Sequence, residues 1–376
     1  MFSYPTPFTP PTTEDDRLSW LRLIRSRRVG VATFYRLIEE HGTARAAILA
    51  LPEIARAAGV QAYEPCPEGV ALAELKAGQA AGARLLCRGE PAYPQALADL
   101  PDAPPVLWAM GDPAHLARPM VALVGARSAS SLGTRMARKL AEGLGAAGFT
   151  VVSGLARGVD AAAHTAALPT GTVAVMAGGV DAIYPAENTA LAGEITEKGL
   201  RLSEQPMGLA PLARHFPLRN RIISGLARAV VVVEAAARSG SLITARTALD
   251  QGRDVLAVPG HPFDGRASGC NMLIRDGATL VRGVDDVLAA LTLDPPAEPR
   301  IAEPAVAASP APERIWRGMA ALHRQILDRL GPSPVAEDQL IRDLALPAAT
   351  IAPELLTLEL DGRIERQAGG LLSRAE

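Results

Sequence analysis

The chain has 376 residues, of which 48% are hydrophobic and 4% aromatic, and its formal net charge is −2. This length favours two or three domains over one, and so few aromatic residues mean that the core is built from Ala, Val, Leu and Ile. The balanced charge excludes a protein that attracts nucleic acid through its overall field, so any site for a polyanion must be local.

Cysteine usage and the absence of membrane-like segments predict the compartment. Cys66, Cys87 and Cys270 show no CxxC spacing and cannot form a closed set of disulfides. No stretch as long as a membrane helix is free of charges or of Pro and Gly breaks. The N-terminus also lacks the basic and apolar regions of a signal peptide. We therefore expect a soluble cytoplasmic protein that makes no contact with a membrane.

The first 79 residues predict a lead-in followed by a helical module. Residues 1–15 contain four prolines and little to bury, which predicts disorder. Residues 16–79 show helical spacing, with Gly30 and Gly42 as expected helix stops. Such a module is typical of SAM or helix-hairpin-helix domains. Its turn Arg-Ser-Arg-Arg-Val-Gly at 25–30 is either a holder for a DNA phosphate or an ordinary solvated basic turn.

Residues 80–291 alternate short apolar strands with helices. A connector over 85–111 comes first, with strand-like pieces at 91–94 and 104–108. The strands expected after it are 121–124, 150–152, 173–176, 202–204, 229–234, 255–258 and 279–281. This alternation predicts a parallel sheet covered on both faces. The expected fold class is therefore α/β, a Rossmann-like, doubly wound, mostly parallel sheet of about seven strands.

The remaining residues predict a linker and a small terminal domain. Residues 292–312 are dense in Pro, Ala and Glu without periodicity, which is typical of a linker. Residues 313–376 show three amphipathic segments and then a wing-like hairpin at 362–372. We expect a winged-helix domain, whose partner, duplex DNA or a protein, the sequence leaves open.

Glycines and polar residues cluster where the expected strands end, which is where doubly wound sheets bind ligands. These residues are Gly125, Arg127 and Ser128; Ser153, Gly154, Arg157 and Gly158; Gly178 and Gly179; and Arg238, Ser239, Gly240 and Ser241. A single cluster of this kind is more often a plain turn. Several at successive strand ends, with arginines among them, predict a cationic rim in which backbone amides approach phosphates.

A second basic feature is the segment Phe-Pro-Leu-Arg-Asn-Arg-Ile-Ile-Ser-Gly-Leu-Ala at 216–227. Pro217 suits the first turn of a helix, so Arg219, Asn220 and Arg221 would lie at its N-terminal end. Two arginines there repel the helix dipole, which leaves a solvated basic end or a phosphate clamp. The neighbouring glycine turns favour the clamp. Because the arginines are two residues apart, the sequence leaves open whether both point inward.

Motifs for catalysis or nucleotide binding are weak. The first turn reads Gly-Ala-Arg-Ser-Ala-Ser-Ser-Leu-Gly rather than GxGxxG, and no GxxxxGK[ST] is present. Asp160 and His164 share a helix face and are either a catalytic or metal pair or, as we favour, residues that order the helix start. Glu204 and Glu234 are either paired acids or, as we favour, partners that orient the arginines. We expect no catalytic residue, no metal and no cofactor.

Seven motifs resemble, in order and spacing, the DNA-processing protein A (DprA/Smf) family. They are Val-Ala-Leu-Val-Gly-Ala-Arg-Ser at 121–128, Ser-Gly-Leu-Ala-Arg-Gly-Val-Asp at 153–160, Ala-Gly-Gly-Val-Asp at 177–181 with Tyr-Pro-Ala-Glu-Asn at 184–188, Ser-Glu at 203–204, the segment from Phe216, Ser-Gly-Ser-Leu-Ile-Thr-Ala at 239–245, and Val-Pro-Gly at 258–260. The match covers residues 85–291, and both terminal modules fit the family's three-part layout less specifically.

The resemblance implies a non-catalytic protein that protects incoming single-stranded DNA and loads the RecA recombinase onto it during natural transformation. It also implies a homodimer formed through the Rossmann-like domain. The DNA pocket carried over by position comprises Gly125, Arg127, Ser153, Gly154, Arg157, Phe216, Arg219, Asn220 and Arg221. Chemistry agrees, because arginines neutralise phosphates and an aromatic ring gives a base a surface on which to stack.

One departure from the family and one competing hypothesis bear on this site. Family members often carry a basic residue within 184–188, where this chain has Ala186, so one phosphate contact is lost or is supplied by Arg214. The competing hypothesis is a nucleoside-monophosphate phosphoribohydrolase of the lysine-decarboxylase-like family. Such enzymes depend on a PGGxGT turn near a catalytic glutamate, and the equivalent turn here reads Ala-Arg-Ser-Gly-Ser-Leu-Ile-Thr.

Overall fold

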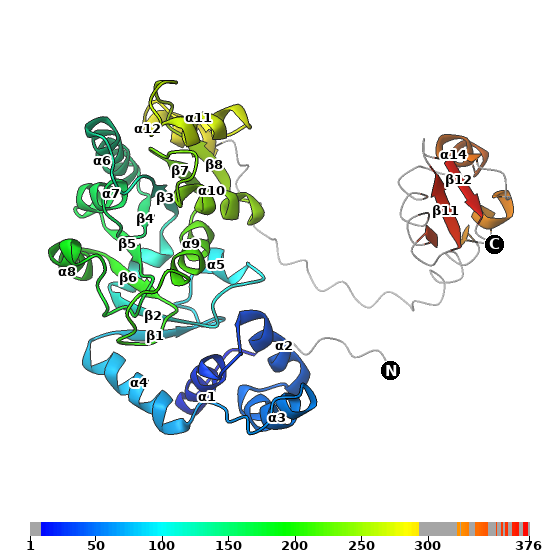
Figure 1. The fold of residues 1–376 in the computed structure, drawn as a ribbon, viewed down its shortest axis with the longest axis horizontal. Helices are drawn as coiled ribbons and strands as arrows, with labels where there is room; N and C mark the ends of the chain where they lie inside the picture. The colour runs from blue at the N-terminus through cyan, green and yellow to red at the C-terminus, as the bar shows by residue number, and fades with distance from the viewer. Residues whose placement is uncertain are drawn as a thin grey trace, which may run out of the picture. The chain divides into compact units, whose positions relative to one another are not determined.

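The structure, a computed structural model, divides into two compact units, Met1–Pro296 and Ala297–Glu376, and each is described by itself (Figure 1). The described residues are 9–292, 322–323, 325–330, 335–344, 351, 355, 358–359, 363–367 and 371–374. Apart from its first residue, the expected linker over 292–312 lies outside the described residues, as do residues 1–8 of the expected lead-in.

A nine-stranded sheet forms the centre of the first unit, in the order β1-β2-β6-β5-β4-β3-β7-β8-β9. Its strands are β1 (Arg84–Cys87), β2 (Val106–Gly111), β3 (Met120–Val124), β4 (Thr150–Ser153), β5 (Thr172–Val175), β6 (Leu200–Ser203), β7 (Ala229–Val232), β8 (Asp254–Ala257) and β9 (Thr279–Leu280). Each neighbouring pair from β6 through β9 is parallel, which confirms the seven expected strands.

The segment expected as a connector contributes two further strands. β2 pairs antiparallel with β6, and β1 pairs antiparallel with β2 at the edge of the sheet. The prediction of a strand at 91–94 is wrong, because the two prolines of this segment have no amide hydrogen to donate to a neighbouring strand. It forms a turn instead, in which the Tyr93 amide donates to Glu90 O over 3.0 Å.

Helices cover both faces of the sheet, which confirms the doubly wound α/β fold. Successive residues of β3 alternate between two hydrophobic clusters, with Val121 and Leu123 on one face and Ala122 and Val124 on the other. The first face packs against α6 (Ser131–Ala146), α7 (Val159–Ala167), α8 (Thr189–Lys198) and α12 (Val284–Thr292). The second packs against α5 (Gln95–Ala98), α9 (His215–Leu226), α10 (Ser241–Asp250) and α11 (Ser268–Arg275).

The strand order reverses at β3, and α9 makes the crossing. The chain leaves β6, passes through α9 and continues into β7 on the other side of β3. The buried residues Ile222, Ile223 and Leu226 of α9 pack on this part of the sheet. Such a switch point opens a crevice at the carboxyl ends of the strands on either side of the reversal.

Four helices precede the sheet: α1 (Glu14–Arg25), α2 (Val31–His41), α3 (Ala44–Ala57) and α4 (Glu68–Ala80). The lead-in expected through residue 15 is too long, because Thr13 caps α1 and exchanges hydrogen bonds with Asp16 in a capping box. Gly42 ends α2 as expected. Gly30 does not stop a helix; it precedes α2, and α1 has already ended at Ser26.

The helical module shares its core with the edge of the sheet. Trp20 and Phe34 of the module belong to the same buried cluster as Val106, Trp108 and Met110 of β2. Because of this shared core, the module and the sheet belong to the same compact unit.

The second unit has the elements of a winged helix. Its described parts include α14 (Glu337–Leu344) and a small sheet of order β10-β12-β11, formed by β10 (Val335–Ala336), β11 (Ile364–Gln367) and β12 (Leu371–Arg374). β11 and β12 pair antiparallel, which confirms the expected wing. The core includes Leu340, Ile351, Leu355 and Leu372.

Two further observations concern membrane-spanning helices and cysteines. Within the described ranges, no helix combines the length and the apolar character needed to cross a bilayer. All three cysteines are free thiols and are buried.

Candidate functional site

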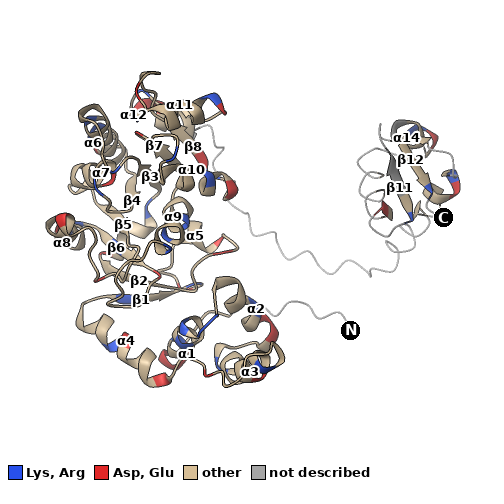
Figure 2. Cartoon of the chain, in the orientation of Figure 1, with Lys and Arg blue, Asp and Glu red and all other residues tan. Residues whose placement is uncertain are grey.

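A cavity of about 560 Å³ opens at the switch point, where β3 and β7 end. We call it the strand-end cavity. Its wall includes Gly125, Arg127 and Ser128 after β3, Phe216, Arg219 and Asn220 of α9, Arg238, Ser239, Gly240 and Ser241 before and at the start of α10, and Arg266 after β8. Four guanidinium groups therefore surround one crevice. In Figure 2 charges of both signs are interspersed over the unit, so the positive charge of the cavity is local.

Arg219 lies at the base of the cavity with only 6% of its surface exposed. Its Nη1 donates to Val175 O at the end of β5 over 2.9 Å, whereas its buried Nε has no partner among the described residues. Burial lowers the pKa of Arg219 to about 10, although Asp160 acts in the opposite direction. The group therefore stays protonated at neutral pH and brings a partly unsatisfied cation to the cavity.

Two glycines of the turn after β4 make room for this arrangement. A Cβ on Gly154 would stand 1.7 Å from Arg219 Nη1, so any side chain there would displace the guanidinium. Gly158 has a φ of +74°, and a Cβ on it would stand 2.2 Å from Ala126 O. Because L-residues rarely adopt this φ, Gly158 fixes the approach of the β4 turn to the β3 turn.

Asp160 and His164 hold the same turn together, as we favoured from the sequence. The Asp160 carboxylate accepts hydrogen bonds from the Gly154 amide (3.1 Å) and the Ala156 amide (3.3 Å). His164 Nε2 accepts from the Leu155 amide, and its Nδ1 lies 2.8 Å from Thr172 Oγ1. Both side chains are buried; burial raises the pKa of Asp160 and lowers that of His164 to about 3.

Phe216 forms an aromatic platform beside the cations. The Arg127 guanidinium lies 5.1 Å from the centre of the Phe216 ring, and the Tyr184 ring meets it edge-on at 5.8 Å. On one side Phe216 faces the strand-end cavity, and on the other it lines a small hollow with Gly154, Arg157 and Tyr184. A planar ligand group can therefore stack beside several positive charges.

Arg221 points elsewhere, which answers the question that the sequence left open. Residues two apart on a helix project in nearly opposite directions, since each residue turns the helix by about 100°. The Arg221 guanidinium donates to the Glu204 carboxylate and to Asp102 O. Its side chain is only 11% exposed and is absent from the wall of the strand-end cavity. Burial raises the pKa of Glu204, and Arg221 opposes that shift.

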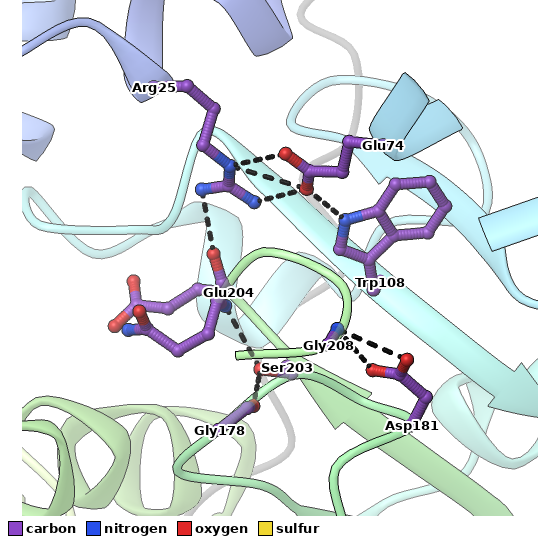
Figure 3. Close-up of polar contacts among 9 residues, drawn as sticks. Arg25, Glu74, Trp108, Gly178, Asp181, Ser203, Glu204 and Gly208 are labelled. Atoms are coloured by element: carbon purple, nitrogen blue, oxygen red, sulfur yellow. Dashed lines mark hydrogen bonds and ion pairs between the residues drawn. The ribbon is translucent and has the colours of Figure 1, made fainter. Parts of the chain in front are cut away.

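Glu204 in turn is held by the helical module (Figure 3). Arg25 Nη1 donates to Glu204 O over 3.1 Å, and its Nε and Nη2 bind Glu74 of α4. Glu74 also accepts from Trp108 Nε1 over 2.8 Å. The expected phosphate-holding turn at 25–30 therefore begins with an arginine that is already engaged within the protein. Through Glu204, the helical module braces the outer face of α9.

Several expected site residues lie off the cavity wall. Ser153 is buried with Oγ donating to Leu123 O, and Gly158 serves the turn. Gly178 and Gly179 follow β5, two strands from the switch point, and the chain at 206–211 covers them. The cavity thus unites the ends of β3, β7 and β8 with α9, and the β4 turn adds Ala156 and Asp160. The expected site residues that do not line the cavity are Ser153, Gly154, Arg157, Gly158, Gly178, Gly179 and Arg221, of which Gly154 and Arg157 line the small hollow beside Phe216. Their role in binding DNA stays a prediction.

The expectation that Glu204 and Glu234 orient arginines holds for Glu204 only. Glu204 pairs with an arginine, as expected. Glu234 does not: it accepts from the Ser130 amide over 2.9 Å and from Ser130 Oγ at the start of α6. The two residues also follow β6 and β7, which are separated by three strands, so they are not paired acids.

The sequence missed two contributors. Arg266 lies in the loop after β8, and applying the strand-end rule to that strand would have included it. Tyr184 comes from the segment that carries Ala186, which is exposed at the start of the 3-10 helix η2 (Ala186–Asn188). Arg214 is exposed immediately before α9, and neither it nor Ala186 lines the cavity. Within the part of the chain that the structure describes, no group of three potential metal ligands comes together.

Comparison with known proteins decides the family. Residues 84–292 match the family described as DNA recombination-mediator protein A, residues 14–77 the DprA-like N-terminal HHH domain, and residues 302–370 the DprA winged helix domain. The chain belongs to the DNA-processing protein A family. Protein Smf of Synechocystis is 36% identical over 322 residues, which are 78% of this chain and 81% of that protein.

Two relatives of this family have solved structures. The X-ray structure of DNA processing protein A from Streptococcus pneumoniae has a TM-score of 0.58 at 38% identity, covering 69% of this chain and 98% of that one. The structure of DNA processing protein A from Helicobacter pylori, which is described as giving insight into a single-stranded DNA binding mode, has a TM-score of 0.52 at 31% identity. It covers 56% of this chain and 96% of that one.

The buried His164 predicts how stability depends on pH. Its pKa falls from an ordinary 6.5 to about 3 on folding, so below pH 6.5 the unfolded chain binds a proton that the folded chain excludes. Lowering the pH from 6.5 towards 3 therefore destabilises the fold, by about 1.4 kcal/mol per pH unit. His164→Gln should remove this slope in urea titrations repeated across the range. The raised pKa of Asp160 acts with the opposite sign in both proteins, so parallel curves would contradict the assignment to His164.

Proposed function

We propose that the strand-end cavity binds single-stranded DNA, and that the protein protects this strand and delivers it to the RecA recombinase during natural transformation. The observation that carries the DNA-binding part is the placement of Phe216 beside Arg127 and Arg219, in a cavity that Arg238 and Arg266 complete. Cations that follow a phosphate backbone and rings that stack on bases are the two components of single-strand recognition.

Stacking on Phe216 explains why the strand must be single. In a duplex both faces of each base are covered by its neighbours, so a half-buried ring at the base of a crevice cannot reach them. In a single strand an unpaired base can enter beside Phe216, while its phosphates meet the arginines and the N-terminal amides of α10. The relative from Helicobacter pylori supports this use of the fold, since its structure is described in terms of a single-stranded DNA binding mode.

The remaining parts of the proposal depend on family membership. Relatives from Streptococcus pneumoniae and Bacillus subtilis are named DNA processing protein DprA. From the family we propose the RecA step, a homodimer formed through the Rossmann-like domain, a cytoplasmic location, and a role without catalysis. We also propose that Arg214, next to the platform, replaces the phosphate contact that Ala186 cannot make.

Removing the platform should weaken binding of single strands selectively. We expect Phe216→Ala to lower affinity for oligothymidylate by about 1–3 kcal/mol, the usual cost of losing one base stack, measured by fluorescence anisotropy. Leu218→Ala is the matched control, since Leu218 is 46% exposed on the same helix and off the cavity wall. Wild-type affinity for a duplex of the same length should be much lower, and equal affinity for both forms would refute the proposal.

Substitutions of Arg127 and of Arg221 should weaken DNA binding in different ways. Arg127→Gln removes a phosphate contact, so the slope of log affinity against log salt should flatten by about 0.7, the value for one phosphate of a single strand. Arg221→Gln should weaken binding with the slope unchanged, because Arg221 holds α9 through Glu204. Glu204→Gln should reproduce that result, and the double variant should be little worse than either single one. A flattened slope for Arg221→Gln would make Arg221 a direct contact.

The competing enzymatic hypothesis has a direct test. A phosphoribohydrolase needs a glutamate facing its substrate, whereas Glu234 binds Ser130 and faces the opposite side of the sheet from the strand-end cavity. We therefore expect no free base when the protein is incubated with nucleoside monophosphates and the products are separated by chromatography. Base release that Glu234→Gln abolishes would overturn the binding-protein proposal.

A further inference from the structure

The loop between β8 and α11, residues 258–267, lies at the surface, yet hydrogen bonds hold its backbone in place. The Gly260 amide donates to Asn271 Oδ1 over 3.1 Å, and Asn271 Nδ2 donates back to Gly260 O over 3.0 Å. The Asp264 carboxylate accepts from the backbone amide, Nε and Nη2 of Arg266 at 3.0 to 3.1 Å. Two successive turns, Asp264 N to His261 O and Ala267 N to Asp264 O, complete the bracing.

This loop presents a phenylalanine to solvent. Phe263 is 94% exposed, the largest exposed fraction among the large hydrophobic residues that the structure describes. Among the described residues its ring contacts that of His261, at 5.5 Å between ring centres. The braces of the loop involve its backbone and its polar side chains, so Phe263 adds little to the fold. Isolated apolar residues on a surface are common, and what sets Phe263 apart is its fixed presentation together with its position.

The loop separates two cavities. Arg266 lines the strand-end cavity on the face of the sheet covered by α9 and α10. His261 and Asp264 line a second cavity of about 690 Å³ against α6, on the other face. That second cavity carries the basic side chains Arg135, Arg138 and Lys139 of α6 together with the acidic side chains Glu142, Glu234 and Asp264. Cations therefore lie on both sides of the loop whose tip is Phe263.

We propose that Phe263 is a second stacking platform for the same single strand. A strand that leaves Phe216 would pass Arg266, stack one base on Phe263 and bring its next phosphates towards the basic side chains of α6. This inference rests on the proposed function and extends its footprint. A nucleic acid fits better than a protein partner here, because the loop around Phe263 offers Asp264, Arg266 and His261 rather than the apolar surroundings of a protein hot spot.

Strand length separates the two platforms in an experiment. Binding is measured for an oligothymidylate of roughly four nucleotides, which fills only the strand-end cavity, and for one of roughly thirty nucleotides. We expect Phe263→Ala to leave the short strand unaffected and to weaken binding of the long one by roughly 5- to 100-fold. Phe263→Trp should restore the affinity, and its added fluorescence, relative to wild type, should be quenched by the long strand alone. Leu49→Ala, at a residue 77% exposed on α3, is the control for loss of a surface hydrophobe.

The outcomes also separate this inference from the proposed function. If Phe263→Ala leaves the long strand unaffected while Phe216→Ala weakens both, the second platform is refuted and the strand-end cavity stands. If neither variant changes binding, both proposals fall. If Phe263→Ala changes the sedimentation coefficient of the free protein without a length-dependent loss of binding, the loop is an interface between copies, and the inference is overturned.

Discussion

The burial of Arg219 is the constraint on which the rest of the site depends. A guanidinium at the base of a crevice loses most of its hydration, and here it recovers one hydrogen bond to Val175 O and the nearby charge of Asp160. The Asp160 carboxylate accepts from the amides of Gly154 and Ala156, and no ion pair within 4.0 Å joins it to Arg219 among the described residues, so it attracts the guanidinium only at longer range. The result is a positive charge that the protein satisfies only in part, in a place where a phosphate would complete it.

Keeping that charge in place requires both faces of α9 to be fixed. On the inner face, Ile222, Ile223 and Leu226 pack on the sheet. On the outer face, Arg221 is held by Glu204, whose backbone carbonyl is bound by Arg25 of the helical module (Figure 3). The helix that carries Phe216 and Arg219 is thus held between the strand ends and a second element of the fold. This gives the N-terminal module a part in shaping the cavity even though it contributes no residue to the cavity wall.

Sequence patterns predicted the fold and about half of the residues that line the strand-end cavity. The other residues could not be predicted, for physical reasons. Seven parallel strands and the helix from Phe216 follow from local periodicity. The order of the strands does not, because the crossing from β6 to β7 is a property of tertiary packing. Because of that crossing, the cavity opens at the ends of β3, β7 and β8. It therefore includes Arg266 after β8 and leaves out Gly178 and Gly179 after β5. For Arg219 and Arg221, helix geometry shows that they diverge, but only the positions of Val175 and Glu204 show which one faces the strand ends.

The contrast between a neutral chain and a cationic crevice bears on how the site selects its ligand. At physiological ionic strength, exposed charges act over about 8 Å, so groups outside the crevice contribute little to its potential. The chain as a whole carries a net charge of −2, so the surface outside the crevice offers the phosphates of a rigid duplex few favourable contacts. A flexible single strand can instead bend into the crevice, where Arg127, Arg219 and Arg238 act together beside Arg266, which is paired with Asp264, and where an unpaired base can stack on Phe216. Under the proposed function, selectivity for single strands arises from confining the positive charge to a crevice rather than spreading it over the surface.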